Sequence, residues 1–252
     1  MIKLFRNIRQ KLIAQGKTAN PAFAKASAGT YLKYAIGEIV LVVIGILIAL
    51  QINTWNEDYK NSKRERGYLI NLQQDLMADS LRLSELKHNF ELAEKSKRSF
   101  GKIIEGQNAS LDSLTVHFYN QTDIITDFVP NSTTLDELKY SNGLNLISNP
   151  QLRRQIVTLY NSYDDLILKL KLGTEKAQII WSYTGKFVKN VDAITNDEIN
   201  ELLNDNFFRN QMLLNYLYTQ FTATSKAYEN CIETLNLIKK EIKNDKTLSQ
   251  HP

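Results

Sequence analysis

The chain has 252 residues, of which 43% are hydrophobic and 23% are charged, as in ordinary folded proteins. The formal net charge is +4, but the first 34 residues hold seven basic residues and no acid. From Asn53 onward the balance is slightly acidic, with 24 basic against 26 acidic residues. A nucleic-acid-binding domain needs a concentrated basic surface, so we expect no nucleic-acid partner.

Side chains suited to metal binding and catalysis are few and scattered. The single cysteine, Cys231, excludes an intramolecular disulfide and a multi-cysteine metal site. His88, His117 and His251 lie too far apart for a short metal-ligand motif. The sequence also lacks phosphate-loop, Gly-x-Ser-x-Gly and His-Glu-x-x-His motifs. We therefore expect no catalytic residue, no cofactor, no metal site and no enzyme activity.

Residues 1–30 consist of a basic segment and a segment rich in small residues. Ile2, Phe5, Ile8 and Leu12 recur at helical spacing among the bases. This pattern fits either contact with an anionic membrane surface or a topology signal alone. Residues 18–30 are rich in alanine and predict a flexible linker. We expect residues 1–30 to be a cytoplasmic tail and linker.

Residues 31–54 are predicted to form one transmembrane helix. Residues 39–50 are uninterrupted apolar or glycine residues, with more apolar residues on both sides, and about 20 residues cross a bilayer. Lys33 and Tyr34 precede the run and Trp55 follows it, where interfacial anchors belong. A cleaved secretory signal is the competing interpretation, but no small-x-small cleavage site follows the run.

The charge distribution predicts the orientation of this span. Because the bases precede it, the positive-inside rule places the N-terminus in the cytoplasm. The rest of the chain then faces the periplasm from the inner membrane. The lipid bilayer is the first expected partner.

Three residues inside the span have two interpretations each. Glu38 lies about one turn into the helix, so its carboxylate either reaches the interface or pairs with Lys33 or a partner helix. Gly45 and Ala49 form a small-xxx-small pair that allows two spans to pack closely, although such pairs are common by chance. A homo-oligomer is therefore one possible assembly.

Residues 55–246 are predicted to form an outward bundle of three long helices and several short ones, followed by a disordered tail at 247–252. The first long helix begins near Trp55, either continuing from the membrane helix or following a kink, and ends near Glu105, where Gly106 can stop it. Its seam alternates steps of three and four, with Asp79 and Lys97 as polar members that either set the register or face solvent. The seam positions are 69, 72, 76, 79, 83, 86, 90, 93, 97, 100 and 104.

The second and third long helices carry similar seams. Asn149 and Pro150 predict the start of the second helix. Its seam, interrupted by Gly173 and Thr184, comprises Leu152, Ile156, Leu159, Tyr163, Leu166, Leu170, Ala177, Ile180, Phe187 and Val191. The third seam comprises Leu203, Phe207, Leu214, Leu217, Phe221, Thr224, Tyr228, Cys231, Leu235, Ile238 and Ile242. Because Cys231 falls on it, we expect a buried structural thiol.

Short helices are predicted between the first two long ones. One spans residues 111–119, and the other begins after Thr133 or Thr134. The sequence Thr134-Leu-Asp-Glu137 reads as a capping box, and Gly143 as a helix stop.

Two segments, residues 34–56 and 134–160, resemble a family of uncharacterised bacterial inner-membrane proteins. The first reads Tyr-Ala-Ile-Gly-Glu-Ile-Val-Leu-Val-Val-Ile-Gly-Ile-Leu-Ile-Ala-Leu-Gln-Ile-Asn-Thr-Trp-Asn and is the more specific. The resemblance implies a single span and a helical outer domain. It also implies that the linker at residues 18–29 is an insertion, and it carries no activity or catalytic residue.

These patterns favour a membrane-anchored envelope interaction or scaffold protein with an unidentified envelope partner. The alternative is an extracytoplasmic domain that senses a ligand and signals through a separate membrane partner. The N-terminal segment is too short to fold into a signalling domain of its own, so sensing would require that second protein.

Overall fold

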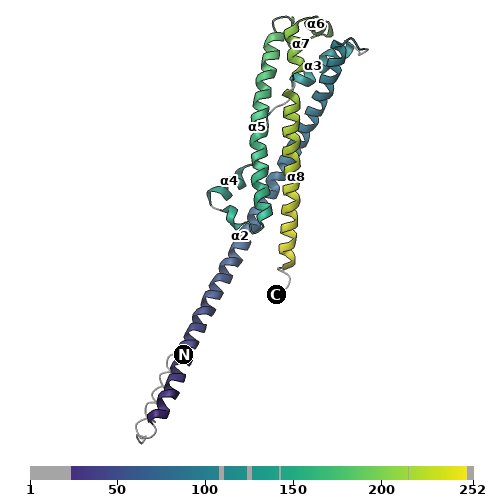
Figure 1. The fold of residues 1–252 in the computed structure, drawn as a ribbon. Helices are drawn as coiled ribbons and strands as arrows, with labels where there is room; N and C mark the ends of the chain where they lie inside the picture. Colours follow the sequence, from purple (N-terminus) through teal and green to yellow (C-terminus); the bar gives the residue numbers. More distant parts are fainter. Residues whose placement is uncertain (1–23, 108–110, 124–126, 142, 215, 249–252) are drawn as a thin grey trace. The chain divides into compact units, whose positions relative to one another are not determined.

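The computed structural model describes residues 24–107, 111–123, 127–141, 143–214 and 216–248. Within this part of the chain the protein is all-helical, with 86% helix and no strand (Figure 1). Residues 1–61 and 62–252 form two compact units. The all-α fold class predicted from the sequence is confirmed.

The first unit is described from Ala24, where helix α2 (Ala24–Ile104) begins. This start is earlier than residue 31, and residues 24–30 are helical where we expected a flexible linker. Alanine at positions 24, 26 and 28 has the highest helix propensity of all residues, which explains the early start. The remainder of the predicted tail and linker, residues 1–23, lies outside the described residues.

Helix α2 ends in a Schellman motif around Gly106, as the sequence predicted. The amide of Gln107 donates to the carbonyl of Lys102 at 2.9 Å, and the amide of Gly106 donates to Ile103 at 3.0 Å. Gly106 adopts a φ of 71°, which glycine reaches without steric cost. This glycine therefore fixes where the long helix stops.

The second unit has a main hydrophobic core built from α2, α5 (Pro150–Thr184) and α8 (Tyr216–Leu248). The seam predicted on α2 is confirmed from Leu69 to Ala93 and again at Phe100. Between Ala93 and Phe100 the structure buries Ser96, whereas Lys97, the predicted seam residue, is only half-buried. Lys97 is therefore not a seam residue, because Ser96 fits the inner face with less desolvation.

Helix α5 begins as predicted, since the side chain of Asn149 accepts from the amides of Gln151 and Leu152 at 2.9 and 3.2 Å. Gly173 and Thr184 are buried and continue the seam, which we had taken to be interrupted there. The helix ends at Thr184, so Phe187 and Val191 no longer follow its period and are 57% and 46% exposed. Their predicted burial was wrong.

Close packing of α5 against α8 depends on Gly173. A Cβ atom at this position would lie 1.5 Å from Nε2 and 2.3 Å from Cδ of Gln220. Gln220 is itself only 1% exposed. Glycine therefore makes room for a buried amide between the two helices.

The third predicted helix is divided into α6 (Asn196–Leu202), α7 (Asn206–Leu213) and α8. Asp205 caps α7 by accepting from the amide of Phe208 at 2.8 Å. This cap starts α7 with a different face inward from the one that the predicted seam requires. Phe208 and Met212 are consequently buried, while Phe207 and Leu214 are 43% and 39% exposed. From Leu217 onward the predicted seam is correct, and α8 continues to Leu248, inside the tail predicted to be disordered.

The chain between α2 and α5 contains η3 (Leu111–Ser113), α3 (Leu114–Thr122), α4 (Thr133–Tyr140) and η4 (Gly143–Leu146). Helix α4 starts at Thr133, so Thr134 lies inside it and the predicted capping box is wrong. Gly143 is not the stop of this helix, which ends at Tyr140; it is buried at the start of η4. A second core cluster in this unit joins Phe100, Phe118, Ile180, Phe208 and Met212 with four other apolar residues.

Candidate functional site

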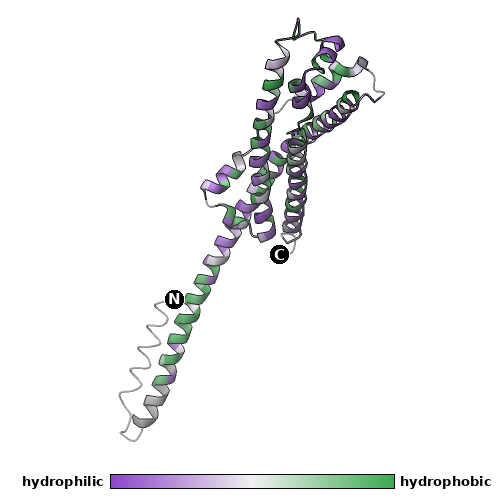
Figure 2. Cartoon of the chain, turned by 45° about the horizontal axis from the view of Figure 1, so that its top comes forward, coloured by the Kyte–Doolittle hydropathy of each residue, from purple (hydrophilic) through white to green (hydrophobic). Residues whose placement is uncertain are grey.

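The apolar part of α2 is the most unusual surface of the first unit. Every described side chain from Ile36 to Ile52 is exposed, and Figure 2 shows an almost unbroken apolar segment there. Even the least exposed of its large residues, Val43, is 47% exposed. By length and composition this helix can cross a membrane, and it is the one such helix in the described chain.

Six residues of this helix were predicted to anchor or orient it. Lys33, Glu38, Ala49 and Trp55 are exposed, and Trp55 is 72% exposed. A Cβ atom added to Gly45 would meet no other atom within 4 Å. The side chain of Tyr34 lies outside the described residues. The structure places these residues along one helix, and their membrane roles stay predictions.

The most elaborate polar site of the second unit is a buried carboxylate that the sequence had marked only as a seam residue. Asp79 on α2 is fully buried. Its Oδ1 accepts from the backbone amide of Asn131 at 3.0 Å and from the Asn131 side-chain amide at 2.8 Å. Asn131 lies in the non-helical segment before α4, 52 residues further along the chain.

Neighbouring groups fix the same segment to the core. Arg82 donates to the carbonyl of Val129 at 2.9 Å, and Thr134 donates to a carboxylate oxygen of Asp75. The hydroxyl of Tyr160 on α5 donates to the carbonyl of Asn131 at 3.3 Å. Residues of α2 and α5 thus hold the segment 128–134 through both its backbone and its side chains.

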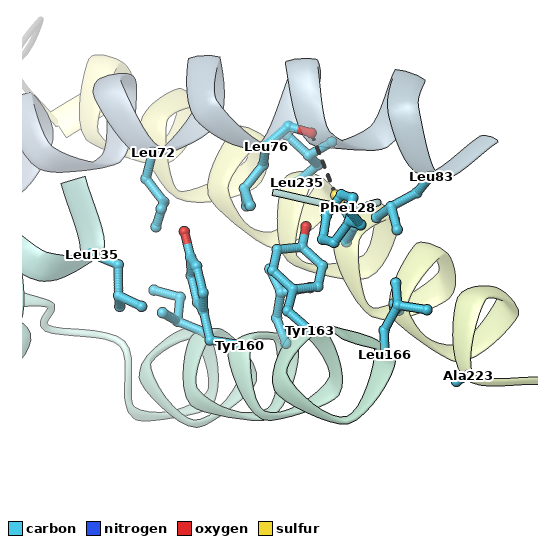
Figure 3. Close-up of a cluster of buried hydrophobic side chains, with 14 of the residues drawn as sticks. Leu72, Leu76, Leu83, Phe128, Leu135, Tyr160, Tyr163, Leu166, Ala223 and Leu235 are labelled. Carbon is cyan, nitrogen blue, oxygen red and sulfur yellow. Dashed lines mark hydrogen bonds between the residues drawn. The ribbon is translucent and has the colours of Figure 1, made fainter. Parts of the chain in front are cut away.

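Aromatic packing completes this attachment. Phe128 is 5% exposed, and its ring meets Tyr163 edge-on with centroids 5.0 Å apart. Figure 3 shows Phe128 near Leu83 and Tyr163, with the ring of Tyr160 on the far side of Tyr163. The segment therefore enters the core at Phe128, and the carboxylate of Asp79 accepts from both donors of the half-buried Asn131.

Burial raises the pKa of Asp79, and the hydrogen bonds from Asn131 and the charge of Arg82 oppose that effect. Burial also raises the pKa of Tyr160, helped by the nearby acids Asp79 and Asp75. A phenol with a raised pKa stays a neutral donor, which suits its bond to Asn131. This chemistry supports a structural clamp that orders the chain rather than proton transfer to a ligand.

Cys231 is fully buried on α8, as the seam predicted, and its thiol donates to the carbonyl of Leu76 at 3.4 Å (dashed line in Figure 3). The hydroxyl of Tyr163 lies against the same sulfur without a well-formed hydrogen bond. Burial raises the pKa of Cys231 to about 11. The thiol is therefore protonated and shielded, and it is not a nucleophile at neutral pH.

A smaller polar group surrounds His117 on α3. Its Nδ1 lies 3.3 Å from the Ser96 hydroxyl, and its Nε2 lies 3.2 Å from the Ser113 hydroxyl. Asn120 donates to the same Ser96 hydroxyl at 3.0 Å. Burial lowers the pKa of His117, so the ring is neutral and links α3 to α2. No group of three or more potential metal ligands occurs among the described residues.

Together these features define an all-helical protein whose long apolar helix is followed by a densely packed helical unit. The chain belongs to a family of unknown function, DUF6090, whose model matches residues 38–220. The match includes most of the apolar segment and continues into α8, so both units carry family sequence. Comparison with curated proteins finds no match. Comparison with solved structures finds none either.

Proposed function

We propose that the protein is a membrane-anchored interaction or scaffold protein of the cell envelope. The observation that carries the proposal is the fully exposed apolar segment of α2. Exposing such side chains to water costs on the order of 1 kcal/mol each, and a bilayer removes that cost. In this proposal residues 31–54 span the inner membrane once and residues 55–246 face the periplasm as a three-helix bundle with coiled-coil-like seams.

The outward surface of the second unit supports an interaction role. On α5, Leu168, Leu172 and Ile179 are 55%, 49% and 42% exposed and recur at helical spacing. On α2, Met77 and Leu81 are 51% and 74% exposed, four residues apart. Apolar residues aligned on outer helix faces are typical of surfaces that contact other proteins. The partner is a second copy or another envelope protein.

Topology is tested by fusing alkaline phosphatase, which is active only in the periplasm, to the C-terminus of the full chain. We expect an active fusion that stays in the membrane during alkaline carbonate extraction. An inactive fusion would reverse the orientation. A shortened, carbonate-soluble protein would instead show that residues 31–54 are a cleaved signal.

Partners are tested by chemical cross-linking of the full-length protein in cells, followed by mass spectrometry. Cross-links between two copies alone support a homo-oligomeric scaffold. A reproducible second membrane or periplasmic protein supports a hetero-oligomeric role. The scaffold proposal fails if only cross-links within one copy are recovered from native membranes.

Ligand sensing is the second candidate function, and one observation favours it. A surface groove between α5 and α7 combines aromatic and polar side chains, as ligand sites do. A sensing domain would signal through a separate membrane partner.

A further inference from the structure

The groove between α5 and α7, called here the α5–α7 groove, has a volume of about 440 Å³. Lys186 lines it, and its Nζ lies over the ring of Tyr183, 5.8 Å from the ring centroid. The other lining residues are Glu175, Gln178, Ile179, Ser182, Tyr183 and Phe207. A volume of this size accommodates one or two sugar rings or a short peptide.

The aromatic wall of the groove is held in place by neighbouring contacts. The ring of Tyr183 lies 4.7 Å from that of Phe207 and 5.0 Å from that of Phe187, measured between centroids. Burial raises the pKa of Tyr183, and so does the nearby carboxylate of Asp205, which also caps α7. The residue that starts the helix carrying Phe207 thus also lies beside Tyr183.

These aromatic rings are exposed although the sequence period predicted their burial. Phe207 is 43% exposed and Ile179, which lines the same groove, is 42% exposed, while Phe187, against Tyr183 but outside the groove lining, is 57% exposed. Phe208, next in the chain, fills the core instead. Tyr183 packs against the second core cluster, but Phe207 and Phe187 belong to neither cluster, and exposed aromatic rings of this kind indicate a binding surface.

The polar side of the groove decides between ligand classes. Glu175 accepts hydrogen bonds, Lys186 donates them, and Gln178 and Ser182 do both. Glu175, Gln178 and Ser182 are exposed and make no side-chain hydrogen bond to other described residues. A docked apolar helix would desolvate two opposite charges at this surface, which is costly. A polyhydroxylated ring instead offers hydroxyls to these groups and an apolar face to the aromatic wall.

We propose that the α5–α7 groove binds a pyranose unit of a glycan, with one sugar face against Phe207 and its hydroxyls toward Glu175, Gln178 and Ser182. This proposal names a partner for the interaction role proposed above. It rests on that proposed function, which places the second unit in the envelope, where glycans occur. Cell-wall glycan and free oligosaccharide share the required chemistry.

The test measures binding of a β-1,4-linked N-acetylglucosamine tetramer to the detergent-solubilised full chain by isothermal titration calorimetry, with cellotetraose as a second probe. We expect saturable binding that weakens about tenfold or more in Phe207→Ala. Tyr140→Ala is the matched control, because Tyr140 is 91% exposed and lies on α4, outside the groove. It should bind like the wild type.

Gln178→Leu separates a sugar from an apolar ligand. It keeps the side-chain size but removes hydrogen bonding, so glycan binding should weaken, whereas an apolar ligand would bind more tightly. Co-sedimentation with purified peptidoglycan distinguishes the two sources: retention indicates cell-wall glycan, and binding of the tetramers alone indicates free oligosaccharide. Binding of neither tetramer at millimolar concentration overturns the proposal, as does equal affinity in Phe207→Ala. The alkaline phosphatase fusion fails or succeeds independently of these results.

Discussion

At the residue scale, Asp79 shows how one buried carboxylate orders a distant segment. Replacing Asp79 by leucine should lower the free energy of unfolding by about 2 to 3 kcal/mol, because both Asn131 donors lose their acceptor. Asp79→Asn keeps an oxygen that accepts both bonds, so the loss should be about 1 kcal/mol or less. Urea unfolding of the full chain in detergent, followed by circular dichroism, measures both. Equal losses in the two variants would contradict this role.

The pKa of Asp79 also predicts a pH dependence. Burial raises its pKa in the folded protein above the value of about 3.9 expected in the unfolded chain. The folded state then binds the proton more tightly than the unfolded chain does. The stability that results from this protonation is fully present at any pH below the unfolded pKa. It is lost as the pH rises through the folded pKa. Relative to Asp79→Asn, the wild type should become less stable as the pH rises above about 4, in parallel urea titrations.

The thiol of Cys231 should be chemically silent in the folded protein. With a pKa of about 11 and complete burial, roughly one thiol in a thousand is ionised at pH 8, and that fraction has no contact with solvent. Maleimide labelling at pH 8 should therefore be slow in the native protein and complete within minutes in concentrated urea. Rapid labelling without denaturant would contradict the described packing of α8.

At the element scale, the contact between α5 and α8 depends on Gly173. Gly173→Ala should lower the free energy of unfolding by about 1 to 3 kcal/mol, because the added Cβ overlaps Gln220. Adding Gln220→Ala should recover part of that loss. Gly67→Ala is the matched control on α2, where nothing lies within 4 Å, and it should stabilise by about 0.5 to 1 kcal/mol. Thermal unfolding of the three variants measures these changes in stability, which should have opposite signs for Gly173→Ala and Gly67→Ala.

The sequence predicts helices well where their period runs unbroken. Steps of three and four locate the buried face of α2 from Leu69 to Ala93 and that of α8 from Leu217, because one helix face meets one core. The prediction fails where a cap restarts the helix, as at Asp205, since periodicity cannot show a change of register. Thr195 and Glu198 form a true capping box whose signature is visible in the sequence and which we did not identify.

The buried polar contacts were harder to predict. Asp79 stood out as a polar seam residue, but Asn131 lies 52 residues away on an irregular segment and no local pattern joins them. Phe187 and Phe207 of the aromatic wall were likewise assigned to the core, because both match a helical period that the structure does not continue. Pairings of this kind depend on tertiary structure, which a one-dimensional pattern does not contain.

At the scale of the whole molecule, charge asymmetry should determine orientation. Seven basic residues precede the apolar segment, at positions 3, 6, 9, 11, 17, 25 and 33. Replacing all seven with glutamine should abolish the proposed bias toward a cytoplasmic N-terminus. The C-terminal alkaline phosphatase fusion should then lose most of its activity. Replacing seven basic residues of the second unit should leave the activity unchanged.

The burial of the one cysteine has a practical consequence for measuring distances in the protein. A spin label attached at an engineered surface cysteine would report on that position alone, because the native thiol is sealed between α8 and α2. Pairs of such labels, one on each side of residue 61, would yield electron-paramagnetic-resonance distance distributions for the two compact units in lipid nanodiscs. The wild-type sequence is thus already a suitable template for that spectroscopy.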